Sequence, residues 1–359
     1  MGNTSFTEII TPTHLSKSDF AFQYAIGRGG FGKVWVVEFR GDEQDYAMKE
    51  MMKLRIISKQ SVNSVLNEQK LLSVLRHPFI VNMKFAFQDR DNLYLVMDLM
   101  KGGDLRYHIN QHERFSEEIT KFFTACIVTG LEYLHINSII HRDIKPENLV
   151  LDNKGYLRIT DFGIARIITS DNTRDTSGTP GYMAPEVLNR QRHSIPVDYF
   201  ALGVIIYEFM TGRRPYLGRS RKEIKDSIMG RQAKLVKSQV PKGWSLESVD
   251  FVNKLLERKP ENRLGSGGPS EVKNHVWLRD FPWKALLEKK IDSPFKPKDD
   301  VNFDPRVLIN WKDDLDYSID FSSIQPLFKK YYYDWRESKN KPNETTLQAK
   351  IEDLEVIQV

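Results

Sequence analysis

The stretch AIGRGGFGKVWVV, residues 25–37, holds three glycines in the spacing G-x-G-x-x-G, at Gly27, Gly29 and Gly32. Backbone without a Cβ can approach phosphate closely, so this spacing serves either a turn that lays a dinucleotide on a helix or a hairpin that covers nucleotide phosphates. A dinucleotide fold needs a helix after the last glycine and an acidic residue about 20 positions on, near where Glu50 stands. The residues that follow, VWVVEF, are instead β-branched and aromatic without helical recurrence, and no Gly-Lys-Ser/Thr closes a P-loop. The stretch therefore predicts a glycine-containing hairpin between two strands.

The chain around this hairpin predicts a five-stranded antiparallel sheet with one helix. The helix covers residues 61–75, where apolar side chains recur at helical spacing until Pro78 ends the pattern. The strands are runs of β-branched, aromatic and other apolar residues separated by polar turns. These runs span residues 22–26, 33–39, 46–51, 79–87 and 92–100.

The pattern changes after KGGD, residues 101–104, from strands to helices. A broad apolar face recurs at helical spacing through residues 117–135. With 359 residues, of which 40% are hydrophobic, the chain is long enough for two lobes. A β-rich part joined to a helix-rich part by a glycine-containing segment is typical of a two-lobed enzyme with a cleft, so the predicted fold class is α+β.

Composition excludes several function classes. The net charge of +5 is spread along the chain, and no basic run is interleaved with aromatic residues at a spacing that would read nucleic acid, so we expect no nucleic-acid partner. No run approaches the roughly 18 apolar residues of a membrane span, so we expect no transmembrane segment. The single cysteine, Cys126, excludes an intrachain disulfide and a cysteine metal cluster and favours the cytoplasm. Gly2, in MGNTSFT, is the residue that N-myristoylation requires, although Phe6 stands where the signal has a hydroxyl, so weak membrane association is an open alternative.

The residues after the hairpin resemble those of a protein kinase. Lys49, in YAMK, follows Gly32 by 17 residues, and Glu68, in NEQ, follows Lys49 by 19 residues on the predicted helix. In a kinase such a lysine contacts the α- and β-phosphates of ATP and is held there by the glutamate. The alternative is that Glu68 is an ordinary solvated glutamate on a helix. A glycine loop alone is also a weak signal, so the later motifs decide whether the chain resembles a kinase.

Two motifs in the middle of the chain supply the chemistry that this resemblance implies. In HRDIKPEN, residues 141–148, Asp143 would accept or orient the proton of the attacking hydroxyl, and Lys145 would lie beside the transferred phosphoryl group. The motif DFG follows Asn148 by 13 residues and begins with Asp161. The resemblance implies that Asn148 and Asp161 bind magnesium, which prefers oxygen ligands.

Two later motifs predict structural pairs. GTPGYMAPE ends with Glu186, which we expect to pair with Arg263 in ENRLG. VDYFALGV begins a buried helix, and its Asp198 is expected to hold the backbone of the loop that carries Asp143.

With these motifs the chain is identified as a member of the eukaryotic protein kinases over residues 20–278, with an N-lobe at 20–99 and a mainly helical C-lobe at 100–278. DSPFKPK and VNFDP are similar to the C-terminal tail of the AGC group, which includes the cyclic-AMP-dependent kinases. Residues 279–359 are therefore interpreted as that tail, and residues 1–19 as an N-terminal extension. Within the group, GGDLRYHI and VDYFALGVIIYEFMTGRRPYLGRSRKEI most resemble the YANK kinases.

The resemblance implies transfer of the γ-phosphoryl group of ATP, with Mg²⁺, to serine or threonine of protein substrates. Lys145 two residues after Asp143, and Thr179 before a proline, are typical of serine/threonine kinases rather than tyrosine kinases. Met97 would be the gatekeeper of the adenine pocket. The ATP-binding residues implied are Ile26, Gly27, Arg28, Gly29, Gly30, Phe31, Gly32, Lys33, Val34, Ala47, Lys49, Met97, Asp98, Met100 and Val150.

Three acidic residues match positions at which AGC kinases bind arginines that precede the phosphoacceptor: Asp104, Glu147 and Glu208. Carboxylates suit this role because they bind a guanidinium in a bidentate fork. The sequence thus predicts a basic-directed substrate; exposed acids without a partner are the alternative.

Regulation departs from the AGC pattern, which has a phosphothreonine three residues before the glycine of GTP. Asp175 stands there, followed by Thr176, and Arg142 and Arg166 resemble receivers of an anion. A carboxylate carries less charge than a phosphate, so Asp175 would order the loop in part without modification. Phosphorylation of Thr176 by an upstream kinase is the alternative.

The tail contains FKKYYY, residues 328–333, which resembles the hydrophobic motif that AGC tails dock onto the N-lobe. Tyr332 stands where that motif carries serine or threonine, so docking is expected and a Ser/Thr switch is not. Residues 345–357 predict a short packed helix.

Two rival readings belong to other classes. A pseudokinase binds nucleotide without turnover, and loss of a catalytic residue is its usual signature; here Lys49, Glu68, Asp143, Asn148 and Asp161 are all present. A dinucleotide oxidoreductase is disfavoured because strands follow the glycines.

Overall fold

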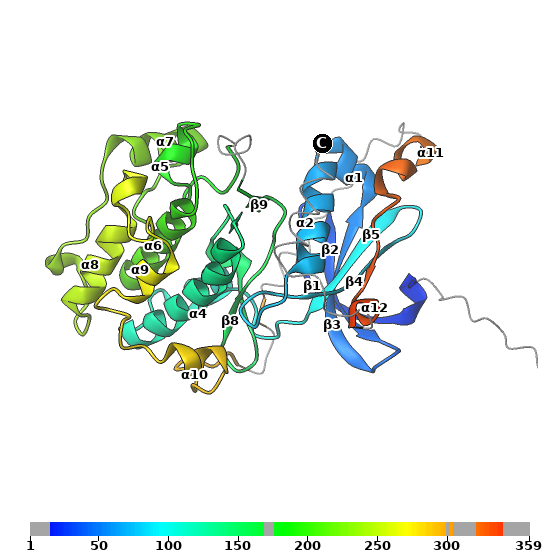
Figure 1. Ribbon diagram of the computed structural model, residues 1–359, viewed down its shortest axis with the longest axis horizontal. Coiled ribbons are helices and arrows are strands. Elements are labelled where there is room, and N and C mark those ends of the chain that lie inside the picture. Colours follow the sequence, from blue (N-terminus) through cyan, green and yellow to red (C-terminus); the bar gives the residue numbers. More distant parts are fainter. Residues whose placement is uncertain (1–14, 169–175, 299–301, 304–320, 340–359) are drawn as a thin grey trace, which may run out of the picture.

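A computed structural model describes residues 15–168, 176–298, 302–303 and 321–339. Figure 1 shows two lobes, one built on an antiparallel sheet and the other on helices around α4 and α6. This arrangement agrees with the predicted α+β class.

The sheet of the N-lobe is antiparallel and begins with the glycine hairpin. Gly32 of the second strand lies opposite Met51 of the third, so the hairpin packs directly on its neighbour. The strand order in the sheet is β1-β2-β3-β5-β4-β10. The first five strands in the chain are β1 (Phe20–Arg28), β2 (Gly32–Phe39), β3 (Gln44–Met52), β4 (Met83–Gln88) and β5 (Asn92–Asp98).

The predicted number of strands in this lobe is wrong, because the tail adds a sixth. β10 (Tyr333–Asp334) pairs antiparallel with β4, placing Tyr333 opposite Ala86 and Asp334 opposite Phe85. Without it, β4 would present unpaired N–H and C=O groups along its edge. The orange tail segment runs along this side of the sheet in Figure 1.

The predicted single helix of the N-lobe is also wrong, because two helices follow β3. α2 (Val62–Val74) confirms the helix expected over residues 61–75. α1 (Lys53–Ser58) precedes it and buries Leu54 and Ile56. Six residues offer too little periodicity to be read as a separate helix beside a strand.

Only part of the apolar run at residues 79–87 is a strand. Its first residues instead link the two lobes: the N–H of Val81 donates to the carbonyl of Ile159 at 2.9 Å, and the N–H of Ile159 donates to the carbonyl of Phe79 at 3.0 Å. These residues are buried between the lobes, which accounts for an apolar run that resembles a strand in the sequence.

The C-lobe is organised around two long helices. α4 (Glu117–Ile136) confirms the helix predicted over residues 117–135 and begins at Ser116, whose hydroxyl accepts the N–H of Ile119. α6 (Pro196–Thr211) is buried over nearly its whole length and ends at Gly212, which has a φ of 77°. The other α-helices that the structure describes in this lobe are α3 (Leu105–His112), α5 (Pro185–Leu188), α7 (Arg221–Gly230), α8 (Leu246–Leu255), α9 (Pro269–Lys273) and α10 (Trp283–Leu287).

Two short two-stranded sheets frame the loop that carries the HRD motif. β6 (Ile139–Ile140) precedes this loop and pairs with β9 (Arg166–Ile167), while β7 (Leu149–Leu151) follows it and pairs with β8 (Leu157–Ile159). The loop is therefore fixed at both ends. In the part of the chain that the structure describes, no helix has the length and apolar content to cross a membrane.

Candidate active site

A cavity of about 630 Å³ lies between the lobes. It is lined by the glycine hairpin, β3, the segment after β5, and β7. The predicted nucleotide residues that line it are Ile26, Gly27, Arg28, Gly29, Val34, Ala47, Lys49, Met97, Asp98, Met100 and Val150.

Four predicted nucleotide residues are not among the described residues that line the cavity: Gly30, Phe31, Gly32 and Lys33. The second half of the hairpin packs against β3 instead of facing the cavity. The carbonyl of Phe31 accepts the N–H of Met52 at 3.0 Å. A Cβ on Gly32 would come within 1.7 Å of the carbonyl oxygen of Glu50. Gly32 is therefore required by strand packing.

The first half of the hairpin has space. A Cβ on Gly27 would meet its nearest neighbour, Val34, at 3.8 Å, and one on Gly29 would have no atom nearer than 3.9 Å. These two glycines are not required by packing within the chain. They leave open backbone facing the cavity, which is a suitable surface for a phosphate chain.

Several cavity residues were missed by the sequence interpretation. Tyr24 and Val36 lie two residues from the predicted Ile26 and Val34, so the period of two along a strand is a signal that could have found them. Asn302 comes from the tail, and its side-chain amide donates to the carbonyl of Lys101 at 3.1 Å. The other missed lining residues are Val81, Leu99, Lys101, Gly103, Thr160 and Phe303.

Lys49 and Glu68 form an ion pair inside the cavity. The Lys49 Nζ lies 2.9 Å from Glu68 Oε2 and 3.1 Å from Oε1, joining β3 to α2. Burial alone lowers the pKa of Lys49, but the charges of Glu68 and Asp161 outweigh it and raise the pKa to about 12. The ammonium group is therefore charged at neutral pH and positioned to bind an anion.

Asp161 faces the same cavity from the opposite lobe. Burial raises its pKa, but Lys49 and His141 more than compensate, so the pKa lies below its ordinary value. Its φ of 65° is in the left-handed region, which is uncommon for a residue with a side chain. The strained backbone holds an ionised carboxylate next to a lysine.

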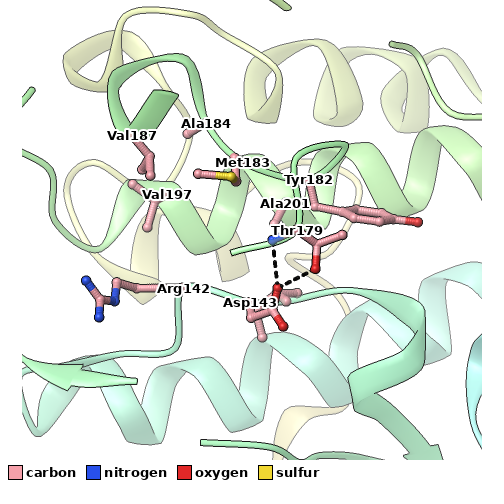
Figure 2. Close-up of a pocket in the computed structure, with 10 residues that line it drawn as sticks. Arg142, Asp143, Thr179, Tyr182, Met183, Ala184, Val187, Val197 and Ala201 are labelled. Atoms are coloured by element: carbon pink, nitrogen blue, oxygen red, sulfur yellow. Dashed lines mark hydrogen bonds between the residues drawn. The ribbon is translucent and has the colours of Figure 1, made fainter. Parts of the chain in front are cut away.

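Asp143 lies at the centre of a hydrogen-bond network on the loop between β6 and β7. Its Oδ1 accepts the N–H of Thr179 at 3.0 Å and the Thr179 hydroxyl at 2.8 Å, and Figure 2 shows the two side chains facing each other while Arg142 points away. Lys145 Nζ lies 2.6 Å from Asp143 Oδ2, and Asn148 Nδ2 donates to the same oxygen at 3.1 Å. The predicted Asp143, Lys145 and Asn148 are thus brought together.

The buried carboxylate of Asp198 anchors this loop. Its oxygens accept the N–H of His141 at 3.0 Å and of Arg142 at 2.8 Å, and also contact His135 Nε2 at 2.8 Å. The prediction that Asp198 holds the loop backbone is confirmed. Arg142 has a φ of 68°, so these bonds secure a conformation that an arginine seldom adopts.

The predicted Glu186–Arg263 pair is also confirmed and lies in the interior. Arg263 Nη1 is 2.6 Å from Glu186 Oε1, and Nη2 is 2.9 Å from Oε2. Both side chains are almost fully buried. The pair joins the segment after the DFG motif to the base of the C-lobe and does not touch the cavity.

The three predicted substrate carboxylates differ in their surroundings. Asp104 accepts the N–H of Tyr107 at 2.9 Å as the N-cap of α3. Glu147 and Glu208 both contact a guanidinium of the chain itself, that of Arg106. The alternative of exposed acids without a partner is therefore wrong for Glu147 and Glu208.

The regulatory residues are only partly described. Asp175 lies outside the described residues, and Thr176 is exposed. Arg142 Nε donates to the carbonyl of Ile164 at 2.8 Å, and Arg166 Nη1 to that of Ala165 at 2.8 Å. Both arginines contact the backbone just after the DFG motif.

The tail docks onto the N-lobe at the FKKYYY segment. Phe328 is fully buried, and Tyr331 is 1% exposed. The Gln69 amide on α2 donates to the carbonyl of Tyr332 at 3.2 Å, and the buried Lys53 Nζ donates to Gln325 Oε1 at 2.7 Å. The predicted docking is therefore present. The helix predicted over residues 345–357 lies outside the described residues.

Comparison with known proteins agrees with this geometry. The protein kinase domain family matches residues 20–278. Protein kinase 2 of Dictyostelium discoideum is 40% identical over 79% of the chain and 58% of its own length. The chain belongs to the protein kinase family. The kinase match ends where the tail was predicted to begin.

Two other relatives have a similar identity to this chain. The eye isozyme of protein kinase C from Drosophila melanogaster is 37% identical over 82% of the chain and 43% of its own length. A RAC family serine/threonine-protein kinase homolog of Dictyostelium discoideum is 36% identical over 78% of the chain and 62% of its own length. The kinase thus spans about half the length of these curated relatives, which include members of the AGC group.

Proposed function

We propose that this chain is a serine/threonine protein kinase that transfers the γ-phosphoryl group of Mg-ATP to protein substrates. The observation that carries the proposal is the convergence of Lys49, Glu68 and Asp161 on one cavity, next to a loop that carries Asp143 and Asn148. The family match supports the same activity.

The cavity has the donor set that Mg-ATP requires. Lys49 supplies a cation for phosphate, and Gly27 and Gly29 supply open backbone. Asn148 and Asp161 offer the oxygen ligands that Mg²⁺ prefers, and Asp161 remains ionised because its pKa is lowered. When bound, the metal would neutralise charge that develops on the transferred phosphate.

The chain's own residues would position the acceptor. Asp143 would accept or orient the proton of a substrate hydroxyl, and Lys145, beside it, would neutralise charge on the reacting side. Thr179 already offers a hydroxyl to Asp143 at 2.8 Å, at a site where a substrate hydroxyl could take its place. Asp198 keeps Asp143 in position through the loop backbone.

The finer predictions remain proposals. A preference for basic residues upstream of the acceptor is supported by Asp104, which forms no ion pair with any residue that the structure describes. Membership of the YANK subgroup is supported by the two quoted sequence stretches alone. Activation through Asp175, or through phosphorylation of Thr176 by an upstream kinase, is supported by the positions of Arg142 and Arg166. A cytoplasmic location is proposed from the sequence, and weak membrane association through Gly2 is the alternative.

The test is phosphoryl transfer by the purified protein. Wild type, Lys49→Met and an exposed control, Lys290→Met, are incubated with labelled Mg-ATP and a serine/threonine peptide library. Wild type and the control are expected to label the peptides, and Lys49→Met to lose about 100-fold or more of the activity. Nucleotide binding without transfer by wild type would indicate a pseudokinase and overturn the proposal. Labelling that survives in Lys49→Met would do so as well.

A further inference from the structure

The guanidinium group of Arg106 occupies a site formed by two carboxylates of the C-lobe. Its Nη1 and Nη2 lie 2.8 Å and 3.2 Å from the two carboxylate oxygens of Glu208, which is a bidentate fork. Its Nε donates to Glu147 Oε1 at 3.0 Å. The hydroxyl of Tyr182 contacts the same guanidinium and donates to Glu208 Oε2 at 3.0 Å.

This cluster lies beside the proposed transfer site. Glu147 belongs to the 3-10 turn Pro146–Asn148, on the loop that carries Asp143. Tyr182 is three residues after Thr179, which hydrogen bonds to Asp143. Figure 2 shows Tyr182 on the same side of Asp143 as Thr179. A peptide whose hydroxyl reached Asp143 would therefore pass close to the cluster.

The cluster is partly open to solvent. The side chain of Glu208 is 7% exposed, that of Arg106 24% and that of Glu147 44%. Burial lowers the pKa of Arg106, but hydrogen bonds and charge from Glu208, together with Tyr182 and Glu147, raise it overall. The arginine remains charged, and two carboxylates share one internal cation.

We propose that Arg106 is a specificity-determining residue: it fills from within the chain a guanidinium site that would otherwise accept an arginine of the substrate. The proposal rests on the proposed function. The inference limits the predicted preference for basic substrates, because a substrate arginine that reaches Glu147 and Glu208 must first displace Arg106.

The physical reason is that replacing Arg106 by a substrate arginine gains little binding free energy. A substrate guanidinium would form bonds like those that Arg106 already makes, while Arg106 would have to find new partners. Without Arg106, Glu208 would be a nearly buried carboxylate with no cation, and Glu147 would add a second negative charge. A substrate arginine would then restore the missing charge and the bidentate fork.

The test is an arginine scan of peptide substrates. A serine peptide without basic residues and its variants with one arginine at each upstream position are compared by kcat/KM for wild type, Arg106→Ala and a control, Arg279→Ala. Arg279 is an exposed arginine, 60% accessible, beside Asp280. At one upstream position, arginine is expected to raise the kcat/KM of Arg106→Ala by about tenfold or more, mainly by lowering KM. At the same position it is expected to change the kcat/KM of wild type and of the control by less than about threefold.

A second measurement does not depend on activity. Methylguanidinium is added to each protein during thermal unfolding. It is expected to raise the Tm of Arg106→Ala and to leave those of wild type and Arg279→Ala unchanged, because only the variant has a free guanidinium site. Arg106→Met, which keeps an apolar stem, takes the place of Arg106→Ala in both experiments if the alanine variant does not fold.

The outcomes separate this inference from the proposed function. If wild type already gains about tenfold from an arginine at the position where the variant does, Arg106 does not mask the site and the inference is wrong. Identical arginine profiles for variant and wild type would also overturn it. If wild type labels no peptide in the set, the proposed function fails, and the methylguanidinium experiment still decides whether Arg106 fills a guanidinium site.

Discussion

The carboxylate of Asp198 accepts the backbone N–H of Arg142 at 2.8 Å, although the two residues are 56 positions apart in the chain. Arg142 directly precedes Asp143, so a residue on the buried helix α6 fixes the backbone of the proposed catalytic loop. The position of Asp143 therefore depends on a buried charge that does not face the cavity.

Asp198→Asn is expected to lower both stability and transfer activity. The amide group would place a donor against backbone N–H groups, and hydrogen bonds to a charged acceptor contribute about 1.5–3 kcal/mol each. We expect a loss of roughly 2–4 kcal/mol in the free energy of unfolding, measured by urea denaturation. Asp292→Asn is the matched control, since that side chain is fully exposed. Equal stability of Asp198→Asn and wild type would contradict this role.

Asp198 also predicts a pH dependence of stability. Burial raises its pKa, but His135 and His141 outweigh burial and bring the pKa below the ordinary value. A carboxyl whose pKa is lower in the folded state stabilises the fold above the unfolded pKa, about 3.9, and loses this effect as the pH falls through the folded pKa. The difference in free energy of unfolding between wild type and Asp198→Asn should therefore shrink below about pH 4. A difference that grows on acidification would show the opposite sign.

The two ends of the glycine hairpin predict different outcomes for the same substitution. Gly32→Ala would place a Cβ within 1.7 Å of the Glu50 carbonyl, so we expect it to lower the free energy of unfolding by about 2 kcal/mol or more. Gly27→Ala has 3.8 Å to its nearest neighbour and should change stability by less than about 1 kcal/mol while weakening nucleotide binding. Urea denaturation and nucleotide titration of both variants test this. The reverse order of stabilities would refute the assignment.

Docking of the tail depends on Phe328, whose neighbour Leu327 provides a control. Phe328 is fully buried, whereas Leu327 is 49% exposed. Phe328→Ala removes an aromatic side chain from the core, a change that costs about 3–5 kcal/mol and should favour an undocked tail. Trypsin should then cleave after Lys329 and Lys330 at least about tenfold faster than in wild type or Leu327→Ala. Equal cleavage rates in all three proteins would mean that Phe328 does not hold the tail.

Much of this site could be predicted because its motifs are local. HRDIKPEN fixes Asp143, Lys145 and Asn148 within eight residues, and their contacts follow from a short loop held between the paired strands β6 and β7. The Lys49–Glu68 pair was predicted from the resemblance to protein kinases, and the structure joins the two residues between β3 and α2. Even Glu186 and Arg263, distant in sequence, were identified through recurring motifs.

The errors arise where a structure depends on a distant partner. β10 has two residues, too few for a period of two to be recognised, and it exists because β4 has an open edge. The buried residues Phe79 to Val81 are apolar like a strand but join the lobes. Arg106 resembles any helical arginine in sequence. Its role depends on carboxylates that lie 41 and 102 positions away.

The most direct test of the account is phosphoryl transfer by Asp143→Asn compared with wild type. Asparagine keeps the size of the side chain and one acceptor oxygen, so folding and Mg-ATP binding should persist. It cannot act as a base, so transfer should fail. With labelled Mg-ATP and a peptide that wild type phosphorylates, the rate of transfer by the variant is predicted to fall by about 1000-fold or more. Transfer by Asp143→Asn at the wild-type rate would contradict the central claim that Asp143 serves the reacting hydroxyl.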